Sequence, residues 1–157
     1  MSLSKNLERW IFASFAQHFK NQQSSIPLYI EKLDKNYRSS DKDWAEFRLD
    51  GPYYRFPSKT TTIIELEVNV YISSLMDSGD IYRLDSNIGV FRSAFTPEIS
   101  IYRYGDGPED DQQLWGCFRL SPIVSGDREL RVTRLGQVEP RTRMENAVIE
   151  GHYECTV

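Results

Sequence analysis

The residues able to do nucleophilic or acid–base chemistry are few and scattered. The chain of 157 residues has two histidines, His18 and His152, and two cysteines, Cys117 and Cys155. Nucleophilic catalysis needs a Ser or Cys beside a positioned base. His18 is expected within a helix and His152 on the polar side of a strand, where ordinary structural roles are the better interpretation. With no Gly-x-Ser-x-Gly elbow and no phosphate-binding glycine loop, the sequence predicts no catalytic residue.

Two groups of carboxylates are the remaining candidates for chemistry. Glu65 and Glu67 lie two residues apart on one face of an expected strand, a geometry that a glycosidase could use. Exposed acidic residues on strands are common, so a solvated face is the preferred interpretation. The second group is an acidic loop made of Asp106, Glu109, Asp110 and Asp111. It lacks the full EF-hand pattern, which favours a solvated loop over a Ca²⁺ site. We therefore predict no metal and no cofactor.

A stretch of arginines follows the acidic loop. It contains Arg128, Arg131, Arg134, Arg141 and Arg143, with acidic residues interleaved. Mixed charge of this kind indicates a solvated face more often than a nucleic-acid groove. A second hypothesis is that the acidic loop of one subunit meets Arg128, Arg131 and Arg134 of the next, giving a head-to-tail ring. Reversing the charge of Arg131 and Arg134 is then expected to weaken assembly.

Composition limits the class of protein. A net charge of −4 argues against a dedicated nucleic-acid binder, which normally has a basic face. The length fits a single domain over residues 1–157. Nothing in the spacing of Cys117 and Cys155 requires a disulfide, and two small buried side chains are the preferred interpretation. The sequence begins without a secretory signal pattern and has no apolar run near 18 residues, so we expect a cytoplasmic protein with no membrane span.

The elements that must position these side chains are dominated by one long strand at residues 60–73. Ile64, Leu66, Val68, Val70 and Ile72 share one parity, and Glu65, Glu67, Asn69, Tyr71 and Ser73 share the other. Successive side chains of a strand point to opposite faces, so one face is dry and the other wet. At roughly 3.3 Å per residue the strand would span about 40 Å. We expect its dry face to meet helices and its wet face to meet a neighbouring subunit, a lumen or solvent.

The other expected elements surround this strand. Apolar residues at three- and four-residue steps predict a helix over 3–22, and a weaker stripe predicts a shorter helix over 80–95. Further strands are expected at 26–32, 44–49, 97–104, 114–120, 130–135 and 149–157, with loops at 33–42 and 75–80 and a turn at 50–52. Residues 53–59 are either a loop or the far half of a hairpin. The order predicts an α+β fold, a mostly antiparallel sheet with an N-terminal helix and a second short helix packed on one face.

Several stretches together resemble a family of phage proteins. They are the N-terminal helix, the segment Asp43-Trp44-Ala45-Glu46-Phe47-Arg48-Leu49-Asp50-Gly51-Pro52, the strand Glu65-Leu66-Glu67-Val68-Asn69-Val70 and the closing strand Val148-Ile149-Glu150-Gly151-His152-Tyr153. In this layout the chain resembles the tail terminator proteins of the tailed-bacteriophage neck, and the related tail-completion and head–tail joining proteins.

The resemblance implies a structural protein of the virion, assembled in the host cytoplasm. Such proteins form a ring, usually a homo-hexamer, on the last ring of the tail tube, where they stop polymerisation and contact the head connector or adaptor. DNA passes through the lumen without sequence recognition, which suits a lumen that is not strongly basic. The family has no catalytic residues and no required cofactor. In this chain the expected subunit or tube contacts are Glu65, Glu67, Tyr71, the acidic loop and the arginines.

Two other functions are compatible with the sequence. One is a non-catalytic carbohydrate- or protein-binding module that uses Trp44, Tyr53, Tyr54 or Trp115 as stacking platforms, although core packing suits these aromatic residues better. The other is an enzyme with an unrecognised site. The mass of the protein in solution most simply distinguishes the ring-forming neck protein from these two alternatives, since a stable monomer at high concentration counts against a ring.

Overall fold

A seven-stranded sheet and two helices make up the fold in this computed structural model, which describes residues 3–31, 42–104, 113–121, 129–137 and 143–157. The helices are α1 (Leu7–Asn21) and α2 (Arg83–Arg92). The strands are β1 (Leu28–Ile30), β2 (Trp44–Arg55), β3 (Ile63–Leu75), β4 (Glu98–Tyr102), β5 (Leu114–Leu120), β6 (Leu130–Gly136) and β7 (Met144–Thr156). The predicted α+β class is confirmed.

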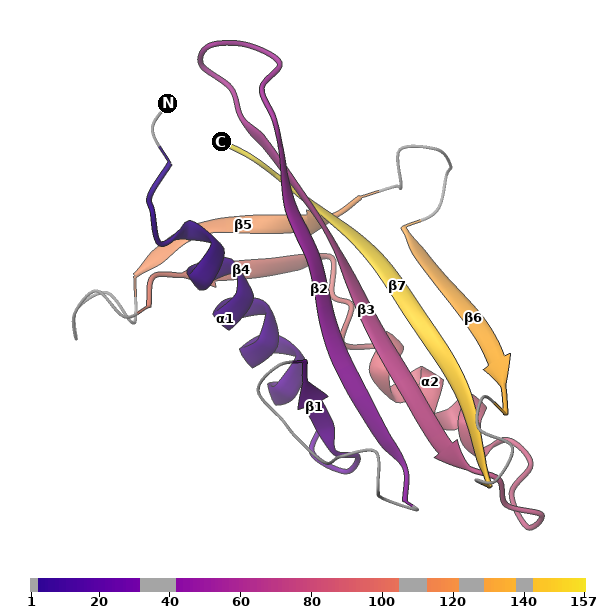
Figure 1. The fold of residues 1–157 in the computed structure, drawn as a ribbon. Helices are drawn as coiled ribbons and strands as arrows, with labels where there is room; N and C mark the ends of the chain where they lie inside the picture. The colour runs from indigo at the N-terminus through magenta and orange to yellow at the C-terminus, as the bar shows by residue number, and fades with distance from the viewer. Residues whose placement is uncertain (1–2, 32–41, 105–112, 122–128, 138–142) are drawn as a thin grey trace.

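Three long strands form the spine of the sheet. The strand order is β1-β2-β3-β7-β5-β4. β6 also pairs with β7, along residues 146–151, whereas β5 pairs with residues 153–154 of β7. Among the described strands the β1–β2 pair is parallel and the other pairs are antiparallel. β2 and β3 continue past the rest of the sheet into a projecting hairpin (Figure 1). The predicted long strand is confirmed, and it is paired along its length with β7.

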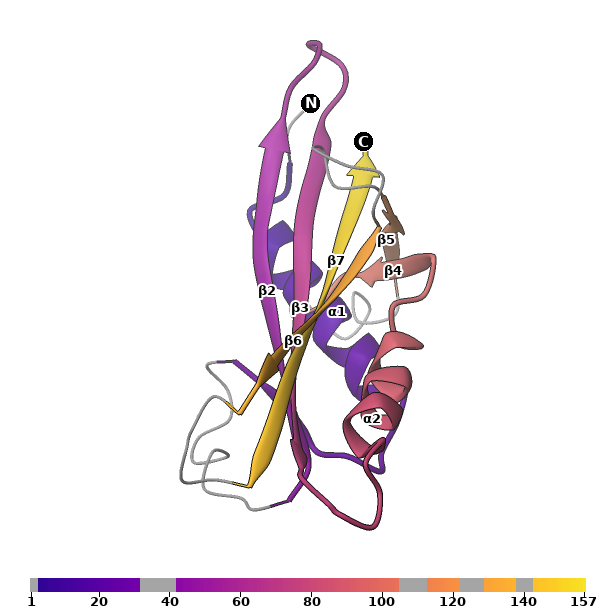
Figure 2. The same ribbon diagram turned by 90° about the vertical axis from the view of Figure 1, so that its right-hand side faces the viewer.

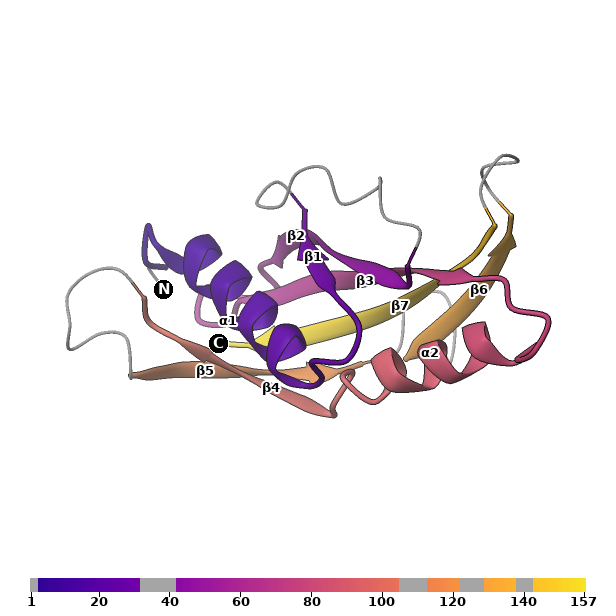
Figure 3. The same cartoon turned by 90° about the horizontal axis from the view of Figure 1, so that it is seen from below.

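The even positions of β3 face the core, as predicted. Ile64, Leu66, Val68, Val70 and Ile72 are each at most 1% exposed. They join one apolar cluster with the buried faces of both helices, and α1 and α2 lie on the same side of the long strands (Figures 2 and 3). The alternation of apolar and polar residues along β3 therefore corresponds to one face of the sheet that the helices cover.

Aromatic residues of α1 fasten the helix to the sheet. Phe15 meets the rings of Phe118 and Tyr153 edge-on, at centroid distances of 5.5 and 5.4 Å. Phe19 packs against Phe47 at 5.3 Å and Phe95 at 4.9 Å. The contacts with Phe118, Tyr153 and Phe95 are edge-to-face, a favourable geometry for ring pairs, and the Phe19–Phe47 pair is tilted at 41°. The helix begins at Leu7, four residues later than predicted.

The predicted turn at residues 50–52 is wrong. β2 runs through Asp50-Gly51-Pro52 with a shift of register against β3 between Asp50 and Tyr53. Gly51 has a φ of 104°, which an L side chain rarely adopts, and its peptide bond to Pro52 is cis. A bulge accommodates such residues within a strand, because the extra residue need not pair. Residues 53–55 therefore continue β2 and pair with β3, so the expected far half of a hairpin is wrong there. Residues 56–59 lie in the loop between β2 and β3, the other expected alternative.

Several boundaries also differ from the prediction. β7 begins at Met144 instead of residue 149, because Ala147, Val148 and Ile149 are all buried and the period-two pattern is lost there. α2 is shorter than the predicted 80–95, and β3 continues to Leu75. Most of the loop predicted at 33–42 and the acidic loop lie outside the described residues.

Candidate functional site

The face of the sheet opposite the helices is the first candidate site, and we call it the open face. Directly opposed residues of antiparallel strands share a face. On this side Tyr71 of β3 lies opposite Glu46 of β2, and Glu67 lies between Asp50 of β2 and His152 of β7. Polar side chains of several strands therefore gather on one surface.

One end of the open face is organised by Arg48. Its guanidinium lies over the Tyr71 ring, 4.6 Å from the centroid, and its Nε donates a 2.5 Å hydrogen bond to Glu46. The Glu46 side chain is only 2% exposed. The hydrogen bond with Glu46 raises the pKa of Arg48, so the guanidinium stays charged. A cation over an aromatic ring stabilises such an arrangement further. This end of the face is preorganised and already paired.

The centre of the open face concentrates negative charge around Glu67. Burial, followed by the carboxylates of Glu150 and Asp50, raises the pKa of Glu67, while Arg131 and His152 act in the opposite direction. Arg131 donates a short hydrogen bond to Glu150. Opposed like charges on neighbouring strands destabilise a sheet. Glu67 is thus the carboxyl group on this face that holds its proton more strongly than usual.

Glu65 has different surroundings from Glu67. Arg55 donates a 3.1 Å hydrogen bond to its carboxylate from across the β2–β3 hairpin. Within the described residues, no group of three or more His, Cys, Asp or Glu side chains is arranged to hold a metal ion. The open face therefore offers paired charges and Glu67, whose pKa is raised by burial and by neighbouring carboxylates.

The structure brings together only part of the predicted contact set. Glu65, Glu67, Tyr71 and Arg131 share the open face. Arg134 lies opposite Ala147, which in turn lies opposite the core-facing Ile72. Arg134 is therefore on the helix side of the sheet, where it pairs with Asp85 of α2. The predicted contacts Asp106, Glu109, Asp110, Asp111 and Arg128 lie outside the described residues.

The histidines and cysteines have identifiable surroundings. His18 Nε2 lies 2.9 Å from the Ala94 carbonyl oxygen and 3.2 Å from Thr96 Oγ1, so it links α1 to the segment after α2. His152 Nδ1 lies 3.3 Å from the Ser121 carbonyl oxygen. Both cysteines are free thiols; Cys155 is buried and Cys117 partly so. Burial raises the pKa of each thiol, which lowers its reactivity.

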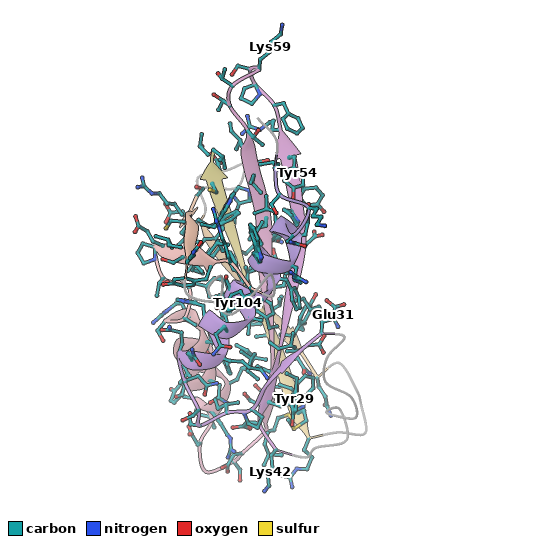
Figure 4. The ribbon with its side chains drawn as sticks, turned by 90° about the vertical axis from the view of Figure 1, so that its left-hand side faces the viewer. Tyr29, Glu31, Lys42, Tyr54, Lys59 and Tyr104 are labelled. Atoms are coloured by element: carbon teal, nitrogen blue, oxygen red, sulfur yellow. The ribbon has the colours of Figure 1, made fainter. Side chains whose placement is uncertain are left out.

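The hairpin that joins β2 to β3 is the second candidate, and we call residues 53–63 the arm. Figure 4 shows Lys59 at its end, beyond Tyr54. Tyr53 is 56% exposed and Phe56 is 66% exposed. Phe56 is not among the contact residues predicted from the sequence, although its place beside the turn-forming Pro57-Ser58 is a signal for an exposed position. An aromatic side chain held out on an arm is typical of a contact surface.

The four aromatic candidates for a binding platform have different environments. Trp44 is partly buried with its ring centroid 6.5 Å from that of Tyr29, and Trp115 is partly buried against the core. The Tyr54 hydroxyl donates a 2.5 Å hydrogen bond to Glu8. Tyr53 is therefore the one of the four that presents most of its ring to solvent.

Comparison with protein-family models and with curated proteins finds no match for this chain. In the described parts of the chain, no helix has the length and apolar character needed to cross a membrane.

Proposed function

We propose that this protein is a structural subunit of a bacteriophage neck, a tail terminator whose copies form a ring on the end of the tail tube. The ring stops tube polymerisation and offers a surface to the head connector, while DNA passes through without sequence recognition. The phage assignment comes from the resemblance in the sequence, and the assembly role has support from the shape of the subunit.

The observation that carries the assembly role is the exposed arm. Phe56 and Tyr53 are more than half exposed on a hairpin whose base is well ordered by pairing with β7. A large apolar side chain held away from its own core loses the free energy of burial unless another molecule covers it. The open face adds Glu65, Glu67 and Tyr71 as a broad polar surface. Both features suit a subunit that contacts copies of itself and other structural proteins.

The decisive experiment follows tail length in infected cells. Phage tails grown without this protein are expected to carry tubes of abnormal length, and supplying the protein should restore the normal length. Electron microscopy of purified tails measures the outcome. Tubes of normal length in its absence would exclude tail termination. Light scattering of the purified chain, at 18.3 kDa per subunit, tests for a ring directly.

A further inference from the structure

The end of the arm is a rigid, basic element with an aromatic side chain. Thr62 and Val157 exchange backbone hydrogen bonds of 2.9 and 2.8 Å, which fix the base of the arm to the end of β7. At the turn the Thr60 backbone N–H donates to Ser58 Oγ at 3.3 Å. Phe56 is 66% exposed three residues before Lys59, and no ion pair of Lys59 is found among the described residues. The arm therefore presents a preorganised aromatic and cationic tip.

The opposite end of the molecule carries a hollow that we call the distal pocket. It has a volume of about 350 Å³ and lies where β3 ends and the chain turns toward α2. Its apolar lining is Leu75, Met76, Ile81 and Leu84. Ile81 is 73% exposed at the pocket mouth. This apolar lining suits a phenylalanine side chain, whose ring gains free energy when it is buried.

The distal pocket is shaped by ordered backbone. The Asp80 N–H donates to the Asp77 carbonyl oxygen at 3.1 Å, and the Gly79 N–H donates to Asp77 Oδ1 at 2.8 Å. The Met76 N–H donates to the Arg143 carbonyl oxygen at 2.7 Å, which fastens the loop to β7. The hollow is thus formed before any partner arrives, which lowers the entropic cost of binding.

The charge around the distal pocket is complementary to that of the arm. Its lining contains Asp77, Asp80 and Glu145 against two arginines, Arg83 and Arg143. Arg83 is already bound to a further carboxylate, Asp43. The lining therefore holds three carboxylates and two guanidinium groups, one of which is paired with Asp43, so the excess charge is negative. Complementary charge of this kind orients an approaching partner.

The tip and the pocket cannot meet within one chain. In the β2–β3 ladder Arg55 lies opposite Ile63 at the tip end, and Trp44 lies opposite Ser73 at the pocket end. The tip of the arm and the turn before α2 occupy opposite ends of the long strands (Figure 1). Two different surfaces at opposite ends of a subunit generate a head-to-tail contact, which closes into a ring when the rotation allows.

We propose that Phe56 of one copy inserts into the distal pocket of the next copy, with Lys59 facing the carboxylates of Asp77 and Asp80. This contact deepens the proposed function by naming the surfaces that join neighbouring subunits, and it rests on that function only for the closure into a ring. It is distinct from the predicted contact between the acidic loop and the arginines.

Two full-length variants test the contact by sedimentation velocity over a concentration series. Phe56→Ala removes the tip, and Ile81→Arg blocks the pocket mouth at a position exposed enough to leave the fold intact. Each is expected to raise the dissociation constant of self-association at least tenfold, as for a buried aromatic anchor. Leu114→Ala, which removes another exposed apolar side chain on β5, is the matched control and should self-associate like the unaltered chain.

Mixing the two variants gives the sharper test. The Ile81→Arg chain keeps its tip and the Phe56→Ala chain keeps its pocket, so one intact contact forms between them. A one-to-one complex that grows no further is the expected result. Unchanged self-association of Phe56→Ala, no complex in the mixture, or an unaltered chain that stays monomeric throughout would each overturn the contact. The length of tails grown without the protein tests the proposed function separately. The contact between subunits and the tail-terminator function can therefore each be contradicted without the other.

Discussion

Nε of Arg83, in the first turn of α2, donates a 2.9 Å hydrogen bond to the carboxylate of Asp43, immediately before β2. The same carboxylate accepts hydrogen bonds from the Leu75 backbone N–H at 2.8 Å and from Asn87 Nδ2 at 3.0 Å. Burial of Asp43 raises its pKa, but these hydrogen bonds outweigh that effect and the pKa is lowered overall. One carboxylate therefore joins the start of β2, the end of β3 and α2.

Asp43→Ala is expected to destabilise the fold by about 2–3 kcal/mol at pH 7, because it leaves buried donors without an acceptor. Since the pKa of Asp43 is lowered on folding, its contribution is present above the ordinary value of 3.8 and is lost as the pH falls below it. Urea unfolding at pH 7 and below pH 3 measures the difference. The exposed Asp80→Ala is the control, and an equal loss for both would contradict the role of Asp43.

Gly151→Ala tests the packing of β7 against the segment after α2. A Cβ at this position would lie 2.5 and 2.6 Å from ring carbons of Phe95 and 3.0 Å from Leu130. Overpacking of this kind typically costs about 1–3 kcal/mol. Gly116→Ala on β5, where nothing lies within 4 Å of the added carbon, should be far milder. Thermal unfolding compares the two, and equal midpoints would show that Phe95 moves aside without cost.

Glu67→Gln tests the negative centre of the open face. The folded pKa of Glu67 is raised above 4.5, so the folded state binds its proton more strongly than the unfolded state. Stability from this group is therefore full below pH 4.5 and falls as the pH rises through the folded pKa. The variant should be more stable than the unaltered chain at pH 7, by less than about 1 kcal/mol, and should lose that advantage near pH 3. Glu65→Gln, which breaks the pair with Arg55, should give no such gain.

The pair of Arg134 and Asp85 separates an internal role from a contact between subunits. Both side chains are at least 41% exposed, so the pair should contribute at most about 1 kcal/mol to folding. If Arg134 meets the acidic loop of a neighbour, Arg134→Glu should weaken assembly and adding Asp85→Arg should not rescue it. Rescue by the second change, seen by light scattering, would assign Arg134 to its own subunit alone.

Periodicity predicted the parts of the fold that depend on local geometry. Ile64 and Val70 face the core and Glu65 faces away because neighbouring side chains of a strand alternate, whatever their partners. The prediction failed at Gly51, where turn propensity gave way to pairing along β3. It also failed at Ala147 and Val148, since burial of consecutive residues removes the alternating signal.

For this protein, sequence alone determined the α+β class, the long strand and the grouping of Glu65, Glu67 and Tyr71 on one face. These follow from side-chain direction within single segments. Tertiary structure alone decided that Glu67 lies between Asp50 and His152, and that the arm and the turn before α2 occupy opposite ends of the long strands. Strand register sets both relationships, and register depends on how residues distant in the chain pack together.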